Sequence, residues 1–152
     1  LILAALAALA WSPIAFAGTC NGEFGWLGKG TAYNLDEGNF IFTGEFSGTF
    51  FNTDTNDATH KMTFQCPGLW HVEGSEGKSN GVCIGKDAEG DKLFMTWGGT
   101  GTFPYTGGPF QVTSGTGKFA GASGSGVFMG HTVAFDDGMN GMGYATWTDC
   151  SY

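Results

Sequence analysis

The stretch GNFIFTGEFSGTFF, from Gly38 to Phe51, alternates large apolar side chains with small or polar ones. Phe40, Phe42, Phe46 and Phe50 fall on one face, and threonine, serine and glutamate fall on the other. Successive side chains of a β-strand point to opposite faces, so this period of two predicts a strand with one buried face.

The same alternation recurs in four later stretches of the chain. It is present in THKMTFQC (59–66), KLFMTWGG (92–99), VFMGHTVAF (127–135) and MGYATWTDC (142–150). DAEGD (87–91) has the composition of a hairpin loop. We count seven or eight strands, depending on whether Pro67 and Gly68 end a strand or only kink it.

The composition predicts the fold class. All 28 glycines and 13 of the 14 phenylalanines follow residue 17, and no long run of helix-forming residues accompanies them. Many short strands with glycine-rich turns indicate an all-β barrel or sandwich. We expect one antiparallel closed β-barrel of about eight strands over residues 18–152.

Residues 1–17 are apolar and uncharged and end in the small-x-small pattern of Ala15, Phe16 and Ala17. This pattern is typical of a signal peptide whose basic n-region is missing. The run is shorter than the roughly 20 apolar residues of a transmembrane helix, and Ser12 and Pro13 interrupt it. We expect cleavage before Gly18, export to the periplasm or the medium, and no membrane attachment afterwards.

Four cysteines in an exported chain predict two disulfides. A hairpin centred in EGSEGKSNG (73–81) would place Cys66 opposite Cys83. Cys20 and Cys150 lie near the two ends, which are neighbours in a closed barrel with an even number of strands. No CxxC spacing supports a zinc site instead.

The glycine-rich segment GTGKFAGASGSG, from Gly115 to Gly126, formally matches a dinucleotide-binding pattern, but its second half cannot form the helix which that pattern requires. The segment resembles the G-T-G-x-[FY]-x-G-x-x-G-x-G stretch of allene oxide cyclase and dirigent β-barrels. The resemblance implies an antiparallel eight-stranded barrel in which this segment makes a tight turn into a glycine-bearing strand. It also implies chemistry without metal or cofactor, either cyclisation of an unstable fatty-acid epoxide or guidance of phenol radical coupling.

The formal charge of −8, with only six lysines and arginines, argues against nucleic acid as a partner. The three histidines have no metal-ligand spacing, and NTDTND (52–57) lacks the glycine and the distant glutamate of a calcium loop. We therefore expect neither a metal nor a cofactor, and we assign no catalytic residue.

Candidate ligand-binding residues follow from the expectation of an apolar lumen. His131 shares the parity of Val127, Met129 and Val133, and His60 shares that of Met62 and Phe64, so both histidines are expected to face inward. There each could brace the core through a hydrogen bond, or orient a ligand and exchange a proton. Phe46, Trp97 and Met129 complete the predicted lumen set. Other aromatic residues are expected in either the core or the cavity wall: Tyr33, Trp70 and Trp147.

Three functions remain open at this point. The first is a secreted barrel that binds a small apolar or aromatic molecule. The second is a cofactor-free isomerase or cyclase acting on an apolar substrate. The third is a barrel filled by its own side chains, with a structural or surface-interaction role.

Overall fold

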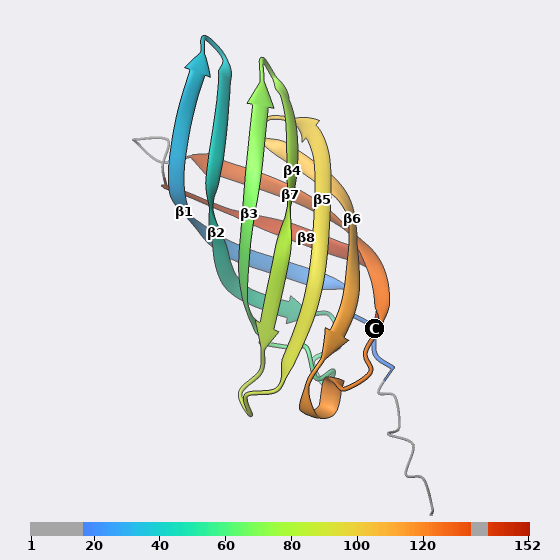
Figure 1. Cartoon of the computed structure of the whole chain (residues 1–152). Coiled ribbons are helices and arrows are strands. Elements are labelled where there is room, and N and C mark those ends of the chain that lie inside the picture. Colours follow the sequence, from blue (N-terminus) through green and yellow to red (C-terminus); the bar gives the residue numbers. More distant parts are fainter. Residues whose placement is uncertain (1–16, 135–139) are drawn as a thin grey trace, which may run out of the picture.

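The computed structural model describes residues 17–134 and 140–152, which form eight antiparallel strands closed into a barrel (Figure 1). Each strand pairs with its neighbours in sequence, and β8 pairs with β1. The strands are β1 (Gly22–Asp36), β2 (Asn39–Asn52), β3 (Thr63–Glu73), β4 (Glu76–Lys86), β5 (Lys92–Thr102), β6 (Tyr105–Gly115), β7 (Gly124–Ala134) and β8 (Asn140–Ser151). The predicted fold class is confirmed, whereas the predicted leader lies almost entirely outside the described residues.

Pro67 and Gly68 do not end a strand. β3 runs through both, and its register with β2 continues across the Glu45–Pro67 and Gly44–Gly68 pairs. Proline lacks a backbone donor, and the ladder with β4 is interrupted here: it runs to the Gln65–Ile84 pair and resumes at Gly68–Gly81. The count of eight strands follows.

The two ends of the barrel differ. The turns of the β1–β2, β3–β4 and β5–β6 hairpins gather at one end, which we call the hairpin end (top in Figure 1). The other end, which we call the closed end, carries longer loops and the 3₁₀ turn η1 (Gly117–Phe119). Among residues 17–134 and 140–152 no helix has the length and apolar character needed to cross a membrane.

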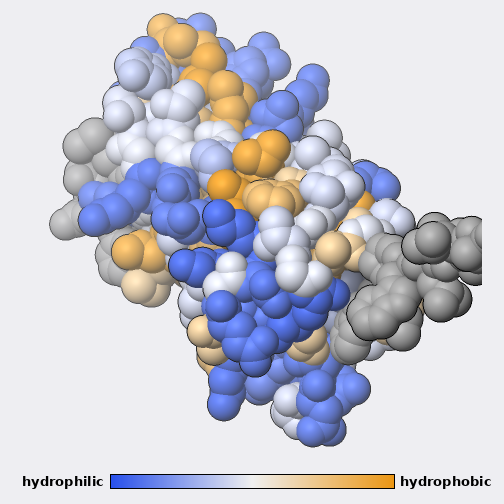
Figure 2. All heavy atoms as spheres, turned by 60° about the horizontal axis from the view of Figure 1, so that its bottom comes forward, coloured by the Kyte–Doolittle hydropathy of each residue, from blue (hydrophilic) through white to orange (hydrophobic). Residues whose placement is uncertain are grey.

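The hydrophobic core fills the closed end. Its largest fully buried side chains include Phe50, Met62, Phe64, Leu93 and Phe119. Phe119 belongs to η1, so the turn between β6 and β7 places a buried aromatic ring across this end of the barrel. The surface at this end, which is turned forward in Figure 2, carries hydrophilic residues with apolar residues among them.

Positive backbone angles explain part of the glycine content at this corner. Gly117 has a φ of +55° and Gly121 a φ of +82°, conformations that side chains with a β-carbon rarely adopt. The chain therefore turns tightly between β6 and β7, as the resemblance implies for this segment.

Other glycines make room for aromatic rings on the inner wall. A β-carbon on Gly68 would lie 2.6 Å from the Trp97 ring, and one on Gly81 would lie 2.7 Å from it. Gly143 accommodates the Trp26 ring in the same way. These inward-facing glycines let the indoles lie close to the backbone of other strands.

Both predicted disulfides are confirmed. Cys66 and Cys83 join β3 to β4 with their Cα atoms 4.1 Å apart, and the turn between these strands is centred on Gly74 and Ser75. Cys20 and Cys150 join the two ends with their Cα atoms 4.8 Å apart. Two disulfides indicate an oxidising, extracytoplasmic environment.

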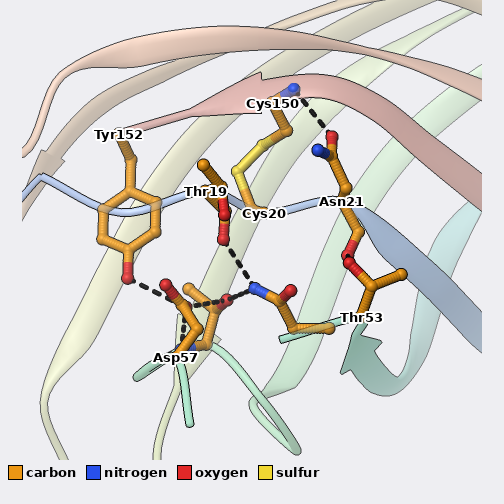
Figure 3. Close-up of a disulfide and its surroundings, with 9 residues drawn as sticks. Thr19, Cys20, Asn21, Thr53, Asp57, Cys150 and Tyr152 are labelled. Atoms are coloured by element: carbon orange, nitrogen blue, oxygen red, sulfur yellow. Dashed lines mark hydrogen bonds between the residues drawn. A yellow bond between two sulfur atoms is a disulfide. The ribbon is translucent and has the colours of Figure 1, made fainter. Parts of the chain in front are cut away.

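A polar network surrounds the Cys20–Cys150 disulfide (Figure 3). The Tyr152 hydroxyl donates to Asp57 Oδ1 at 3.0 Å, and the same oxygen accepts bonds from the backbone N–H and the hydroxyl of Thr59. Asn52 Nδ2 donates to Thr59 Oγ1 and to the carbonyl oxygen of Thr19. The loop between β2 and β3 is thereby fastened to both terminal segments.

Candidate functional site

Two neighbouring hollows occupy the lumen, which is the interior of the barrel. The inner one has a volume of about 100 Å³ and the one nearer the hairpin end about 210 Å³. Trp26, Phe46, Trp70 and Thr132 line both, so the two hollows adjoin. The inner hollow reaches down to Phe110 and Trp147, which belong to the core of the closed end.

The walls of these hollows are aromatic and remain open to solvent. Trp26, Phe46, Trp97 and Phe128 face inward yet are only partly buried, unlike the core phenylalanines. Phe46 lies at the centre of the group, with its ring centroid 5.2 Å from Trp26 and 6.0 Å from Trp97, both edge to face. Such aromatic walls suit apolar or aromatic ligands.

Few polar groups interrupt this lining. The side chain of Ser79 donates to the carbonyl oxygen of Gly99 at 3.5 Å. Thr106 Oγ1 and Trp70 Nε1 are buried and have no hydrogen-bond partner. None of the described residues that line either hollow carries a charge.

The structure places two of the five predicted lumen residues in the wall. Phe46 and Trp97 line the inner hollow. The inward orientation predicted for Met129 and His131 is wrong: Met129 is 58 % exposed, and Phe128, Gly130 and Thr132 face the lumen instead. Both faces of β7 carry apolar residues, so the number of apolar residues on each face does not tell which face is the inner one.

His131 belongs to an aromatic row on the outer surface. Its ring stacks on Tyr105 with centroids 4.7 Å apart and meets Tyr144 edge to face at 5.5 Å. Tyr105 and Tyr144 are the cross-strand partners of His131 on β6 and β8. This histidine therefore neither braces the core nor touches the lumen.

The inward orientation predicted for His60 is also wrong. Its Nδ1 lies 3.0 Å from the carbonyl oxygen of Asn52, and its ring meets that of Phe51, which is exposed. β3 begins only at Thr63, and Lys61 has a φ of +64°. The alternation that includes Met62 and Phe64 thus extends into a turn, where parity does not determine the face.

The remaining aromatic residues divide between the two faces. Trp70 and Trp147 line the inner hollow, as expected of core or cavity residues. Tyr33 lies on the outer face of β1 and is 55 % exposed, so its predicted placement is wrong. Trp26, Thr106 and Phe128 also line the inner hollow and are not among the residues predicted for it. The signal for them is the small residues at alternate positions of other strands. An eight-stranded barrel has little interior space, so a large inward ring requires glycine on the wall that it faces.

A cluster of carboxylates lies in the β4–β5 loop, far from these hollows. Asp87, Glu89 and Asp91 bring three oxygens within 4.8 Å of one another. The ammonium group of Lys118 lies 2.8 Å from Asp87 Oδ2 and 2.7 Å from Glu89 Oε2, and its backbone N–H donates to Asp91. Lys118 thus already supplies the cation of this cluster.

The lumen is consequently the part of the described chain that best fits a ligand. Comparison of the sequence with protein-family models and with curated proteins finds no match. The barrel geometry and the chemistry of its lining therefore carry the functional assignment.

Proposed function

We propose that this protein binds a small apolar or aromatic molecule in the lumen of its barrel. The observation that carries the proposal is the partly exposed set of inward aromatic rings around two adjoining hollows, at one end of a barrel whose other end is sealed. A barrel filled only by its own side chains would bury those rings.

The dimensions support a ligand of one or two rings. A dry protein cavity of about 150 Å³ is large enough for benzene. The two hollows, of about 100 and 210 Å³, adjoin along shared residues and together exceed that size. Trp26, Phe46 and Trp97 would contact such a ligand edge or face on.

The resemblance of Gly115–Gly126 to allene oxide cyclase and dirigent barrels adds a second candidate, a cofactor-free isomerase or cyclase. The described lining offers hydroxyl and indole groups for such a reaction. General acid–base catalysis relies on groups that titrate near neutral pH. Binding is therefore the function that this lining supports best.

We further propose that binding takes place outside the cytoplasm, in the periplasm or the surrounding medium. The two disulfides, one of which borders the inner hollow, support this location. The apolar composition of residues 1–17 gives independent support.

Titration with toluene tests the proposal directly. We expect toluene to shift the indole N–H resonances of Trp26, Trp70 and Trp97, because all three rings line the inner hollow. Thr132→Trp should abolish the shifts by filling space that belongs to both hollows. Thr148→Trp, on the exposed face of β8, is the matched control and should retain them.

If the resonances of the lining indoles stay unchanged at the solubility limit of toluene, the lumen is filled and the binding function is wrong. Equal loss of the shifts in both tryptophan variants would place binding outside the lumen.

A further inference from the structure

Two polar atoms in the lumen lack any partner. Of the three buried side-chain atoms without a hydrogen bond among the described residues, Asp87 Oδ2 faces the Lys118 ammonium. The other two are Trp70 Nε1 and Thr106 Oγ1, on side chains that both line the inner hollow. Their residues are only 6 % and 8 % exposed. A buried donor without an acceptor destabilises the structure, so a partner supplied by a ligand would offset that cost.

Two paired glycines of the inner wall, Gly77 and Gly101, lie beside these residues. Trp70 Nε1 lies 2.6 Å from the position that a β-carbon of Gly77 would occupy. Gly77 is paired with Gly101, whose missing β-carbon would lie 3.1 Å from Thr106 Cα. The Trp70 indole thus lies over Gly77, and no side chain of Gly77 or Gly101 stands between its N–H and Thr106.

The surroundings favour an uncharged oxygen. Trp70 can only donate, while Thr106 can donate or accept, so a hydroxyl or carbonyl oxygen can satisfy both. A carboxylate would be buried without a cation, because the described lining carries no charge. Even after structural relaxation, burial of an unpaired carboxylate is strongly unfavourable.

Negative charges at the hairpin end of the barrel also disfavour a carboxylate ligand. Asp36 and Glu37 stand at the turn of the β1–β2 hairpin, and Glu73 and Glu76 at the turn of the β3–β4 hairpin. All four are exposed. At physiological salt these charges act over only about 8 Å. The cost of burying a carboxylate in the lumen is therefore the main reason that it is rejected, and repulsion by the acidic residues at the hairpin end adds to this cost.

We propose that Trp70 Nε1 and Thr106 Oγ1 form a polar subsite for the oxygen of a neutral alcohol or carbonyl compound, and that the lumen rejects carboxylates. This inference rests on the proposed lumen binding and adds the chemical class of the ligand. The apolar part of the ligand lies against the aromatic rings, while its oxygen lies beside Trp70 Nε1 and Thr106 Oγ1.

Toluene, benzyl alcohol and benzoate test this subsite, because they share one ring and differ in the polar group. Trp70→Phe removes the N–H and keeps an aromatic ring, and Thr106→Val removes the hydroxyl at nearly constant volume. Each substitution should weaken benzyl alcohol binding roughly three- to tenfold more than toluene binding, which corresponds to one net hydrogen bond. Calorimetry measures the affinities, and circular dichroism checks that each variant is folded.

Two further measurements sharpen the result. In the unsubstituted protein, both ligands should shift the Trp70 indole N–H resonance, but benzyl alcohol should move it further downfield than toluene does, because only the alcohol accepts its hydrogen bond. Benzoate at pH 7.5 should bind at least tenfold more weakly than benzyl alcohol, and high salt should recover only a small part of that difference.

These experiments distinguish failure of the polar subsite from failure of lumen binding itself. If both substitutions weaken toluene and benzyl alcohol equally, an ordered water or nothing occupies the subsite, and the inference fails while lumen binding stands. If benzoate binds as tightly as benzyl alcohol, the selection against carboxylates is wrong. If none of the three ligands binds, the proposed function fails and the inference fails with it. Should Trp70→Phe not fold, Thr106→Val alone decides.

Discussion

At the scale of single residues, Tyr152 shows how a polar side chain stabilises the closed end. It is 5 % exposed, its ring packs on Phe119, and its hydroxyl donates to Asp57. Burial of the ring, followed by the neighbouring Asp57 carboxylate, raises the pKa of Tyr152 well above its usual value of about 10. The folded protein therefore holds this proton at pH values at which the unfolded chain releases it.

We predict that Tyr152→Phe lowers the free energy of unfolding by about 1.5–3 kcal/mol near pH 8, because a hydrogen bond to a carboxylate is lost. The stabilisation due to the raised pKa is fully present below pH 10 and declines as the pH rises through the folded-state pKa. The gap between the two proteins should accordingly narrow from pH 10 upward in urea denaturation. Tyr33→Phe, on the exposed face of β1, is the control and should leave stability unchanged. A gap that stays constant between pH 8 and 11 would contradict the explanation.

At the scale of elements, the loop between β4 and β5 is joined to the glycine-rich corner by Lys118. Burial opposes ionisation of Asp87, but the hydrogen bond from Lys118 and the backbone N–H groups of Asp91 and Glu89 outweigh it, so the pKa of Asp87 lies below its usual value. This interaction positions η1, and with it the buried Phe119 that closes the barrel.

Asp87→Asn should reduce the free energy of unfolding at pH 7 by about 1–3 kcal/mol, because the Lys118 ammonium loses its less exposed partner. A lowered pKa stabilises the fold above the unfolded value of 3.8, and this stabilisation is lost as the pH falls through the folded value. Thermal unfolding of the variant and the parent should therefore converge between pH 4 and about pH 2. Asp36→Asn at the exposed hairpin tip is the control, and an equal effect from it would refute the assignment.

Several inward glycines also act between elements, because they make room for aromatic rings from other strands. We predict that Gly81→Ala destabilises the protein by about 1–3 kcal/mol, since the new methyl group would collide with the Trp97 ring and the backbone of Pro67. Gly25→Ala has no atom within 4 Å of the new methyl group and should change stability by less than about 0.5 kcal/mol. Chemical denaturation of the pair decides, and equal effects would show that ring packing is not the cause.

The sequence predicts strands more reliably than it predicts the faces of strands. β2 was assigned correctly because its phenylalanines alternate with polar residues on the exposed face. β7 was not, because Val127 and Met129 are apolar on the outside while glycine and threonine occupy the inside. Packing of Phe128 against Trp97 orients this strand, and that contact joins residues of β5 and β7, which do not pair with each other.

The candidate site was predictable only in part for the same reason. Phe46 and Trp97 could be found from their own strands. The unpartnered atoms of Trp70 and Thr106 become visible only once β3, β4, β5 and β6 are placed side by side. Hydrogen-bond satisfaction is a property of the closed barrel, and the local pattern of the sequence does not contain it.

At the scale of the whole molecule, the two disulfides constrain the chain very differently. Cys20–Cys150 spans 130 residues and connects the first and last segments of the barrel, whereas Cys66–Cys83 spans 17 residues within one hairpin. In the chain-entropy description, a disulfide destabilises the unfolded chain more when it closes a longer loop. Loops of these lengths correspond to about 5 and about 3 kcal/mol.

We predict that replacing Cys20 and Cys150 together by alanine lowers the free energy of unfolding by roughly 2 kcal/mol more than replacing Cys66 and Cys83, as the difference in loop length requires. Alanine avoids burying a new hydroxyl, since all four cysteines are buried. Denaturation of both double variants, with the reduced parent protein as the common reference, measures the two contributions. An equal or reversed order would contradict the loop-length explanation, and would mean that native-state packing or residual structure of the unfolded chain outweighs the difference in loop entropy. In that case the Cys66–Cys83 bond, which borders the inner hollow, would act mainly through the packing of the cavity wall.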